Sequence, residues 1–267
     1  MKTTVRSIFL ILILILCLAF CVCFAFACPA ADFEFRKDIF AQDRTSRLLN
    51  YYVDKFSPEE LTLVIDEQPD DTGRFREIYM DIIGVVIDGV RVESLTFSMV
   101  DAEFNDPSEW ASGNVECKGA LRVRAKCVLR DSDVNAALAA RTFGDDNRWR
   151  NISMKISPNG LYARGIYTAS LWFITLDILI EVNSGLEIVA GKELYLSDYA
   201  FRVNTVGIPD YVARKAVEQI QPILSLDDFP LPLRLNGVRF MDGAAVLYTR
   251  PEPEPLAGGI SYHYTKE

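Results

Sequence analysis

The strongest constraint on the fold comes from residues 115–130, where apolar and polar side chains alternate almost without a break. The odd positions are small or apolar, from Cys117 through Leu121 and Val123 to Leu129, whereas charged residues dominate the even positions. Successive side chains of a β-strand point to opposite faces, so this period predicts a strand with one apolar and one solvated face. A long one-sided strand is typical of an antiparallel sheet.

The rest of the chain predicts about ten strands in total and three helices, over 37–56, over 134–143 and from Pro209 onward. No helix alternates with strands in the βαβ manner, which favours an α+β fold with a long, curved antiparallel sheet. The curvature is expected partly from a bulge near 93–94, where the apolar positions of the strand over 90–104 change parity.

The domain organisation is predicted from composition. No linker rich in Gly, Ser or Pro and no repeat interrupts the chain before residue 250, so we expect one domain over 32–250. Residues 251–255 alternate Pro and Glu, and we expect a disordered tail over 251–267.

The N-terminus indicates export. Lys2 and Arg6 precede an uncharged apolar stretch over 8–27, which ends in an A-x-A pattern, as in a signal peptide. The stretch is also long enough to remain as a membrane anchor, and Cys28 leaves lipidation open. All three outcomes predict a domain in the periplasm or on the outer face of the cytoplasmic membrane.

Charge and cysteine spacing exclude some functions. The net charge of -9 argues against nucleic acid as a partner. The basic positions between Lys118 and Arg130 fit a solvated sheet face, with anionic lipid headgroups as the alternative. A continuous strand would hold the α-carbons of Cys117 and Cys127 roughly 33 Å apart, whereas a disulfide needs less than about 7 Å. No Cys/His spacing suggests a metal, and we expect no cofactor.

The sequence offers little for catalysis. The only histidine, His263, lies in the expected tail and cannot be assigned to a Ser-His-Asp relay. Asp177 is the best candidate acid or base because it lies in an apolar strand over 171–182, but its even-numbered neighbours are the apolar set, so we expect it to face solvent. We therefore expect no enzyme, and a hydrolase is the least favoured alternative.

The second half of the chain carries short motifs in a fixed order. They are residues 133–138 (DVNAAL), Trp149 before 152–156, Gly160-Leu161 before Gly165, 191–194 (GKEL), Ile208-Pro209, 221–226 (QPILSL), 229–232 (FPLP) and 241–243 (MDG). In this order the chain, over 38–250, resembles the LmeA family of exported phospholipid-binding proteins, whose fold is similar to tubular lipid-binding domains. The resemblance implies a sheet wrapped on about three helices, and a protein that binds phospholipid in lipid transfer or in support of envelope lipid or glycolipid biosynthesis.

A curved sheet with few helices can carry more apolar surface than its own side chains cover. A lipid chain could fill the difference, because each buried methylene contributes about 0.8 kcal/mol. Partners would be phospholipid and the membrane surface, and the alternative is an envelope scaffold or interaction module with a dry core. The candidate lipid-binding residues are Leu121, Val123, Leu138, Trp172, Ile174, Leu176, Ile178, Phe201, Val212, Val217 and Ile220.

Overall fold

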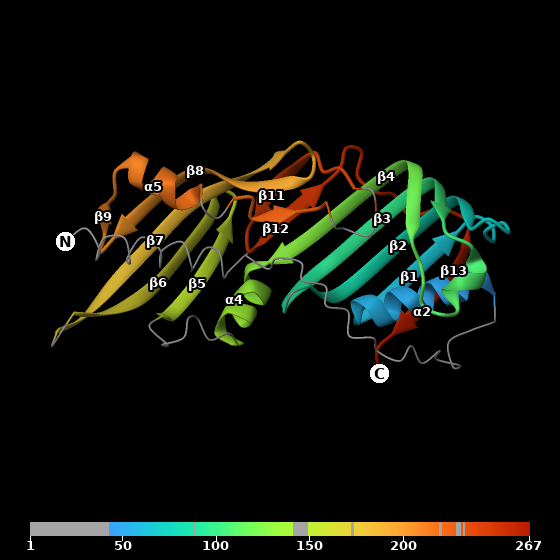
Figure 1. Ribbon diagram of the computed structural model, residues 1–267, viewed down its shortest axis with the longest axis horizontal. Helices are drawn as coiled ribbons and strands as arrows, with labels where there is room; N and C mark the ends of the chain where they lie inside the picture. The colour runs from blue at the N-terminus through green and yellow to red at the C-terminus, as the bar shows by residue number, and fades with distance from the viewer. Residues whose placement is uncertain are drawn as a thin grey trace. The chain divides into compact units, whose positions relative to one another are not determined.

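The computed structural model describes residues 43–87, 89–140, 149–171, 174–218, 221–227, 231 and 233–267. Antiparallel strands dominate and helices are few, which confirms the predicted α+β class (Figure 1). The residues 1–27 predicted as a signal peptide or anchor lie outside the described part. Within that part, no helix has the length and apolar character needed to cross a membrane.

The described part of the chain contains two compact units, and the single domain expected over 32–250 stays a prediction. Among the described residues, unit 1 contains those within 130–226 and 238–246, and unit 2 contains those within 43–129, 227–237 and 247–267. The first boundary falls where a strand passes directly into a helix, so no change in composition marks it.

Unit 2 is built on antiparallel strands in the order β4-β3-β2-β1-β13. Their bounds are Glu60–Ile65 (β1), Arg74–Ile87 (β2), Val90–Phe104 (β3), Cys117–Arg130 (β4) and Ile260–Thr265 (β13). β4 confirms the strand that the alternation over 115–130 predicts. One face of β1–β3 is buried and carries Leu61, Leu63, Ile65, Ile78, Met80, Ile82, Leu95, Phe97 and Met99.

Helix α2 (Arg44–Phe56) packs against β1, β2 and β13 through an apolar stripe that includes Leu48 and Leu49. Asp43 caps the helix by accepting a hydrogen bond from the backbone N–H of Ser46 at 2.7 Å. The sequence predicted this helix over 37–56, and residues 37–42 lie outside the described part.

The pairing of β2 and β3 near 93–94 differs from the predicted bulge. The pairs Ile83↔Ser94 and Val85↔Val92 keep one register, so no residue is inserted and the bulge prediction is wrong. Both strands instead switch their buried side at Gly84, whose φ of +68° is a left-handed conformation. This conformation favours glycine, because residues with a Cβ rarely adopt it, and a Cβ would also displace the Glu59 side chain.

The expectation of a disordered tail over 251–267 is wrong. Glu252 forms an ion pair of 3.0 Å with Lys126 on β4, and the last part of the segment forms β13. β13 pairs antiparallel with β1 from Glu60↔Thr265 to Ile65↔Ile260. The Tyr262 hydroxyl donates a hydrogen bond of 2.8 Å to Asp43 at the start of α2. The Pro-Glu run is short, and the β-favouring residues behind it outweigh its disordering composition.

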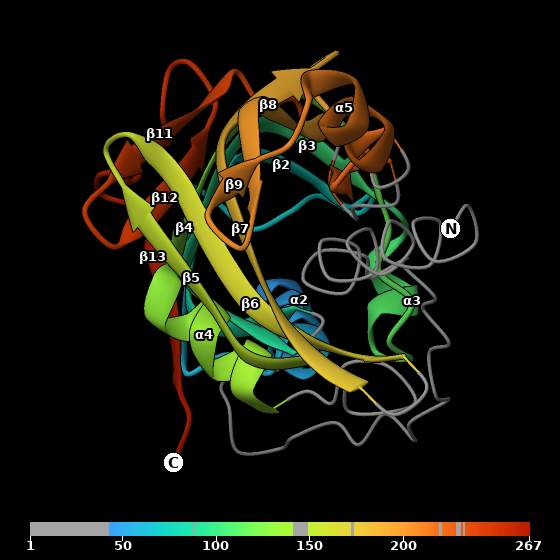
Figure 2. The ribbon, with the colours of Figure 1, turned by 90° about the vertical axis from the view of Figure 1, so that its left-hand side faces the viewer.

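Unit 1 is built on a second antiparallel sheet in the order β10-β8-β7-β6-β5, with β9 paired to β8 (Figure 2). The strand bounds are Trp149–Ser157 (β5), Gly160–Leu171 (β6), Ile174–Val189 (β7), Glu193–Val203 (β8), Val206–Gly207 (β9) and Leu224–Ser225 (β10). Helix α5 (Asp210–Val217) contacts β8. The other elements are helix α3 (Pro107–Trp110) in unit 2 and the hairpin of β11 (Gly237–Met241) and β12 (Ala244–Tyr248).

Helix α4 (Asp131–Ala140) covers the edge strand β5. The Asn135 side-chain amide donates to the Met154 carbonyl, its oxygen accepts from the Met154 N–H, and both distances are 2.7 Å. Asn135 therefore takes the place of a neighbouring strand and satisfies backbone groups that an open edge would expose.

We expect Asn135→Ala to lower the free energy of unfolding by about 2 kcal/mol, because two backbone groups of β5 would lose their partners. Urea denaturation measures the change. Ser132→Ala, at an exposed position on the same helix, should leave stability within about 0.5 kcal/mol of the wild type. Equal stabilities of the two variants would contradict this role of Asn135.

Candidate functional site

One face of the sheet in unit 1 is apolar, and its side chains become more exposed along β7. This face carries the even-numbered residues of the strand: Val182 and Ile180 are buried, Ile178 is half-buried, and Leu176 is 47% exposed. Large apolar side chains become steadily more accessible toward one end of the strand. We call this end, with Leu176 and Ile178, the open end of the apolar face.

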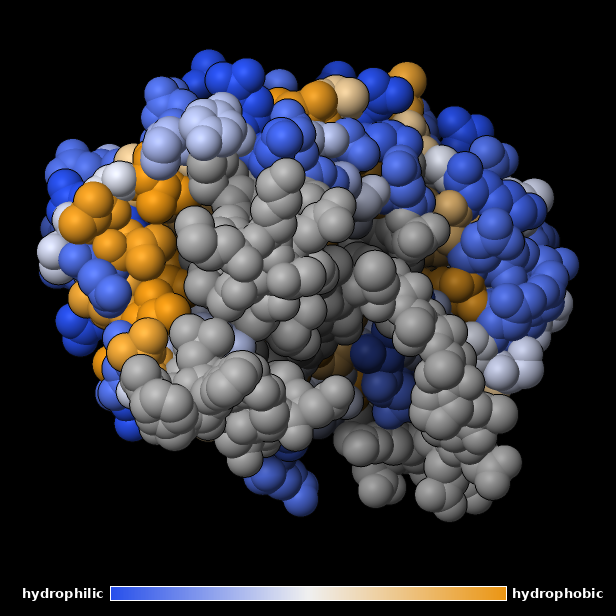
Figure 3. All heavy atoms as spheres, turned by 60° about the vertical axis from the view of Figure 1, so that its left-hand side comes forward, coloured by the Kyte–Doolittle hydropathy of each residue, from blue (hydrophilic) through white to orange (hydrophobic). Residues whose placement is uncertain are grey.

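Neighbouring strands extend the same face, because directly paired residues point to the same side of a sheet. Tyr167 on β6 pairs with Ile178, and Val203 on β8 pairs with Ile180. Val206 on β9 pairs in turn with Val203 and is 68% exposed. Apolar atoms gather on the left of the surface drawn in Figure 3.

The opposite end of the face is filled by the protein itself. Phe201 pairs with Val182 and is buried, as are Ala213 and Val217 of α5. Nearer the open end, Trp149 packs on Tyr167 with ring centroids 5.0 Å apart, so the β6 side of the face is covered beside Ile178. The cover is therefore complete around Val182 and incomplete around Leu176.

The other face of β7 is polar. Asp177 pairs with Arg150 in an exposed ion pair and accepts a hydrogen bond of 3.0 Å from Thr168. This confirms that Asp177 faces solvent. This exposed, ion-paired position differs from the enclosed site expected for an acid catalyst.

The predicted lipid-binding residues are divided between the two units. Leu121 (74% exposed) and the half-buried Val123 lie on β4 in unit 2. Leu138 lies on the buried side of α4, and Phe201 and Val217 lie at the covered end of the apolar face. Ile174 and Val212 belong to β7 and α5, whereas Trp172 and Ile220 lie outside the described residues. The assignment of this set to a lipid stays a prediction.

Two exposed apolar residues were missed by the sequence reasoning. Val206 and Tyr211 are 68% and 65% exposed. Val206 lies in the two-residue strand β9 and Tyr211 lies in the first turn of α5, where no long period marks a face. Only the pairing of β9 with β8 places Val206 on the apolar face.

The two cysteines of β4 are free thiols. Burial raises the pKa of Cys117 to about 11 and that of Cys127 to about 12. Across the described residues, no three His, Cys, Asp or Glu side chains are grouped closely enough to hold a metal ion.

The raised pKa of Cys127 predicts slow alkylation. Cys127 is half-buried, and its raised pKa favours the neutral thiol. At pH 8 the thiolate is roughly one ten-thousandth of the population in the folded state, about three orders of magnitude below the unfolded state. We expect iodoacetamide to modify Cys127 at least about 100-fold more slowly in the native protein than in urea. Peptide mass spectrometry follows this cysteine separately from the others, and equal rates would contradict the burial.

The comparisons with known proteins identify a family. Neither curated proteins nor solved structures provide a match. A family profile described as LmeA-like phospholipid-binding matches residues 72–250, more than half of the chain and including β7 and the open end. The chain belongs to the LmeA-like phospholipid-binding family.

Proposed function

We propose that the protein binds a phospholipid by placing its acyl chains on the open end of the apolar face in unit 1. The observation that carries this proposal is the gradient along β7, from the buried Ile180 to the 47% exposed Leu176. Leaving large apolar side chains in water is unfavourable, and each methylene removed from water contributes about 0.8 kcal/mol. An acyl chain lying along Leu176, Ile178 and Val206 would remove apolar surface of both the lipid and the protein from water.

The proposed cellular role is non-catalytic. The signal-like or anchor-like residues 1–27 support an exported protein, in the periplasm or on the outer face of the cytoplasmic membrane. A role in lipid transfer, or in support of envelope lipid or glycolipid biosynthesis, fits a site that holds acyl chains by non-directional contacts. The similarity to tubular lipid-binding domains, with a curved sheet wrapped on its helices, is part of the same proposal.

Mass spectrometry of an organic extract of the purified full chain tests the function. We expect phospholipid in an amount comparable to that of the protein. A folded preparation that carries no lipid, and that also fails to take up lipid from liposomes, would contradict the proposal and favour a scaffold with a dry core.

A further inference from the structure

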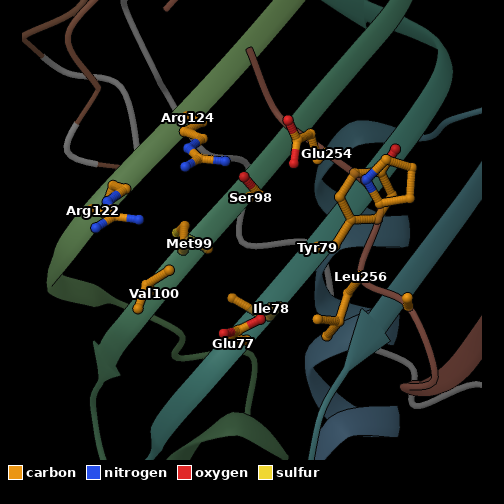
Figure 4. A pocket seen from close by; sticks show the side chains of 12 residues that line it. Glu77, Ile78, Tyr79, Ser98, Met99, Val100, Arg122, Arg124, Glu254 and Leu256 are labelled. Atoms are coloured by element: carbon orange, nitrogen blue, oxygen red, sulfur yellow. The ribbon is translucent and has the colours of Figure 1, made fainter. Parts of the chain in front are cut away.

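A second feature of unit 2 is a cavity of about 240 Å³ on the polar face of its sheet (Figure 4). Two rows of paired residues form its floor. One row is Tyr79, Ser98 and Arg124, and the other is Glu77, Val100 and Arg122, across β2, β3 and β4. The intervening residues Ile78 and Met99 are buried on the opposite face. The cavity is therefore separate from the apolar core of this sheet.

The roof of the cavity is the segment 251–259, which we call the C-terminal strap. Glu254, Pro255, Leu256 and Ala257 line the cavity. Before them, Glu252 forms an ion pair of 3.0 Å with Lys126 on β4, and behind them the chain enters β13. The strap is thus attached to the sheet on both sides of the cavity.

The cavity is lined by two positively and two negatively charged side chains. Arg122 and Arg124 stand on the β4 side, Glu77 stands on the β2 side, and Glu254 comes from the strap (Figure 4). The Arg124 Nε is buried and has no hydrogen-bond partner among the described residues. A buried donor without a partner is costly, and a ligand oxygen at this position would satisfy it.

We propose that this cavity binds a phosphate ester that also carries an ammonium group, as phosphoethanolamine does. Guanidinium groups form strong, charge-assisted hydrogen bonds with phosphate oxygens, which assigns the phosphate to Arg122 and Arg124. The ammonium group is assigned to the Glu77 carboxylate and the face of the Tyr79 ring. A ligand with phosphate alone would leave Glu77 and Glu254 without a positive partner, so the paired charges favour a zwitterion.

The size of the cavity agrees with this ligand. A volume of about 240 Å³ is several times the roughly 30 Å³ that one water occupies in the liquid. The site also lies in a different unit from the proposed acyl-chain site. It therefore goes beyond the proposed function, and either one can fail without the other.

Isothermal titration of the full chain in a nonionic detergent tests the site with O-phosphorylethanolamine and glycerol 3-phosphate. We expect O-phosphorylethanolamine to bind at least about tenfold more tightly, and Glu77→Gln to remove the preference. Arg124→Gln and the more exposed Arg122→Gln should each weaken binding by about tenfold or more. Lys118→Gln, on the same strand but outside the cavity, should bind as the wild type does.

Undetectable binding by the wild type would overturn the proposal, as would equal affinity for the two esters. A shift in the urea midpoint of Arg124→Gln would mean that this variant has also lost stability. In that case Arg122→Gln provides the test, and unchanged binding by that variant would overturn the site. Leu176→Asp, which targets the acyl-chain proposal, should leave this titration unchanged.

A flotation assay distinguishes a lipid headgroup from a free ester. Phosphatidylcholine vesicles receive equal fractions of either phosphatidylethanolamine or phosphatidylglycerol. If the protein prefers vesicles with phosphatidylethanolamine, and soluble O-phosphorylethanolamine abolishes that preference, the result supports a lipid headgroup as the ligand. Binding of the soluble ester with no such preference supports a free ester, and preference for phosphatidylglycerol lost in Arg122→Gln would contradict the zwitterion.

Discussion

Replacing Trp110 with alanine is expected to lower the free energy of unfolding by about 3–5 kcal/mol, because the substitution leaves a large cavity in unit 2. The indole is fully buried and stacks on Phe75 with ring centroids 6.1 Å apart, and Phe104 meets it edge-on at 6.1 Å. Its Nε1 donates a hydrogen bond of 3.0 Å to the Asn105 side-chain oxygen. The variant therefore loses both apolar packing and a buried hydrogen bond.

Trp110→Phe separates these two contributions. It keeps an aromatic ring against Phe75 and Phe104 but cannot donate to Asn105, so we expect a loss about half as large. Urea denaturation followed by circular dichroism measures both variants. A loss below about 1 kcal/mol for Trp110→Ala would show that this cluster does not hold the unit together.

Leu176→Asp is expected to weaken phospholipid binding by about tenfold or more. A carboxylate at the open end would have to lose water when an acyl chain covers it, and that cost opposes binding. Leu176 is already 47% exposed, so the same carboxylate remains hydrated in the lipid-free protein and should change stability little. Titration of a fluorescent phospholipid into the full chain measures the effect.

Thr175→Asp is the matched control. It places the same charge one residue away on the same strand, and its side chain points to the polar face of the sheet. We expect it to bind lipid as the wild type does. Equal weakening by both variants would indicate a general effect of charge, and no weakening by either would place the lipid elsewhere.

The sequence predicted the strands better than the surfaces they form. The alternation over 115–130 correctly predicted β4, yet Leu121 on its apolar side is 74% exposed. Periodicity tells which residues share a face, whereas the cover of that face depends on distant elements. By the same limit, periodicity could not tell that Leu138 and Phe201 are buried whereas Leu121 is exposed.

The polar cavity could not be predicted at all. Tyr79, Ser98 and Arg124 are brought into one row by strand register, and no local pattern specifies that register. The strap that covers them was expected to be disordered because of its Pro-Glu composition. Its place follows from β13, whose pairing with β1 depends on residues about two hundred positions apart.

Photocrosslinking with a phosphatidylethanolamine that carries a diazirine on its acyl chain tests the central claim most directly. After irradiation of the full chain, peptide mass spectrometry locates the labelled residues. We predict labels on Leu176, Ile178 and Val206, at the open end of the apolar face, and their loss in Leu176→Asp. Labels confined to Thr175 and Asp177 on the polar face, or an unlabelled β7, would contradict the account.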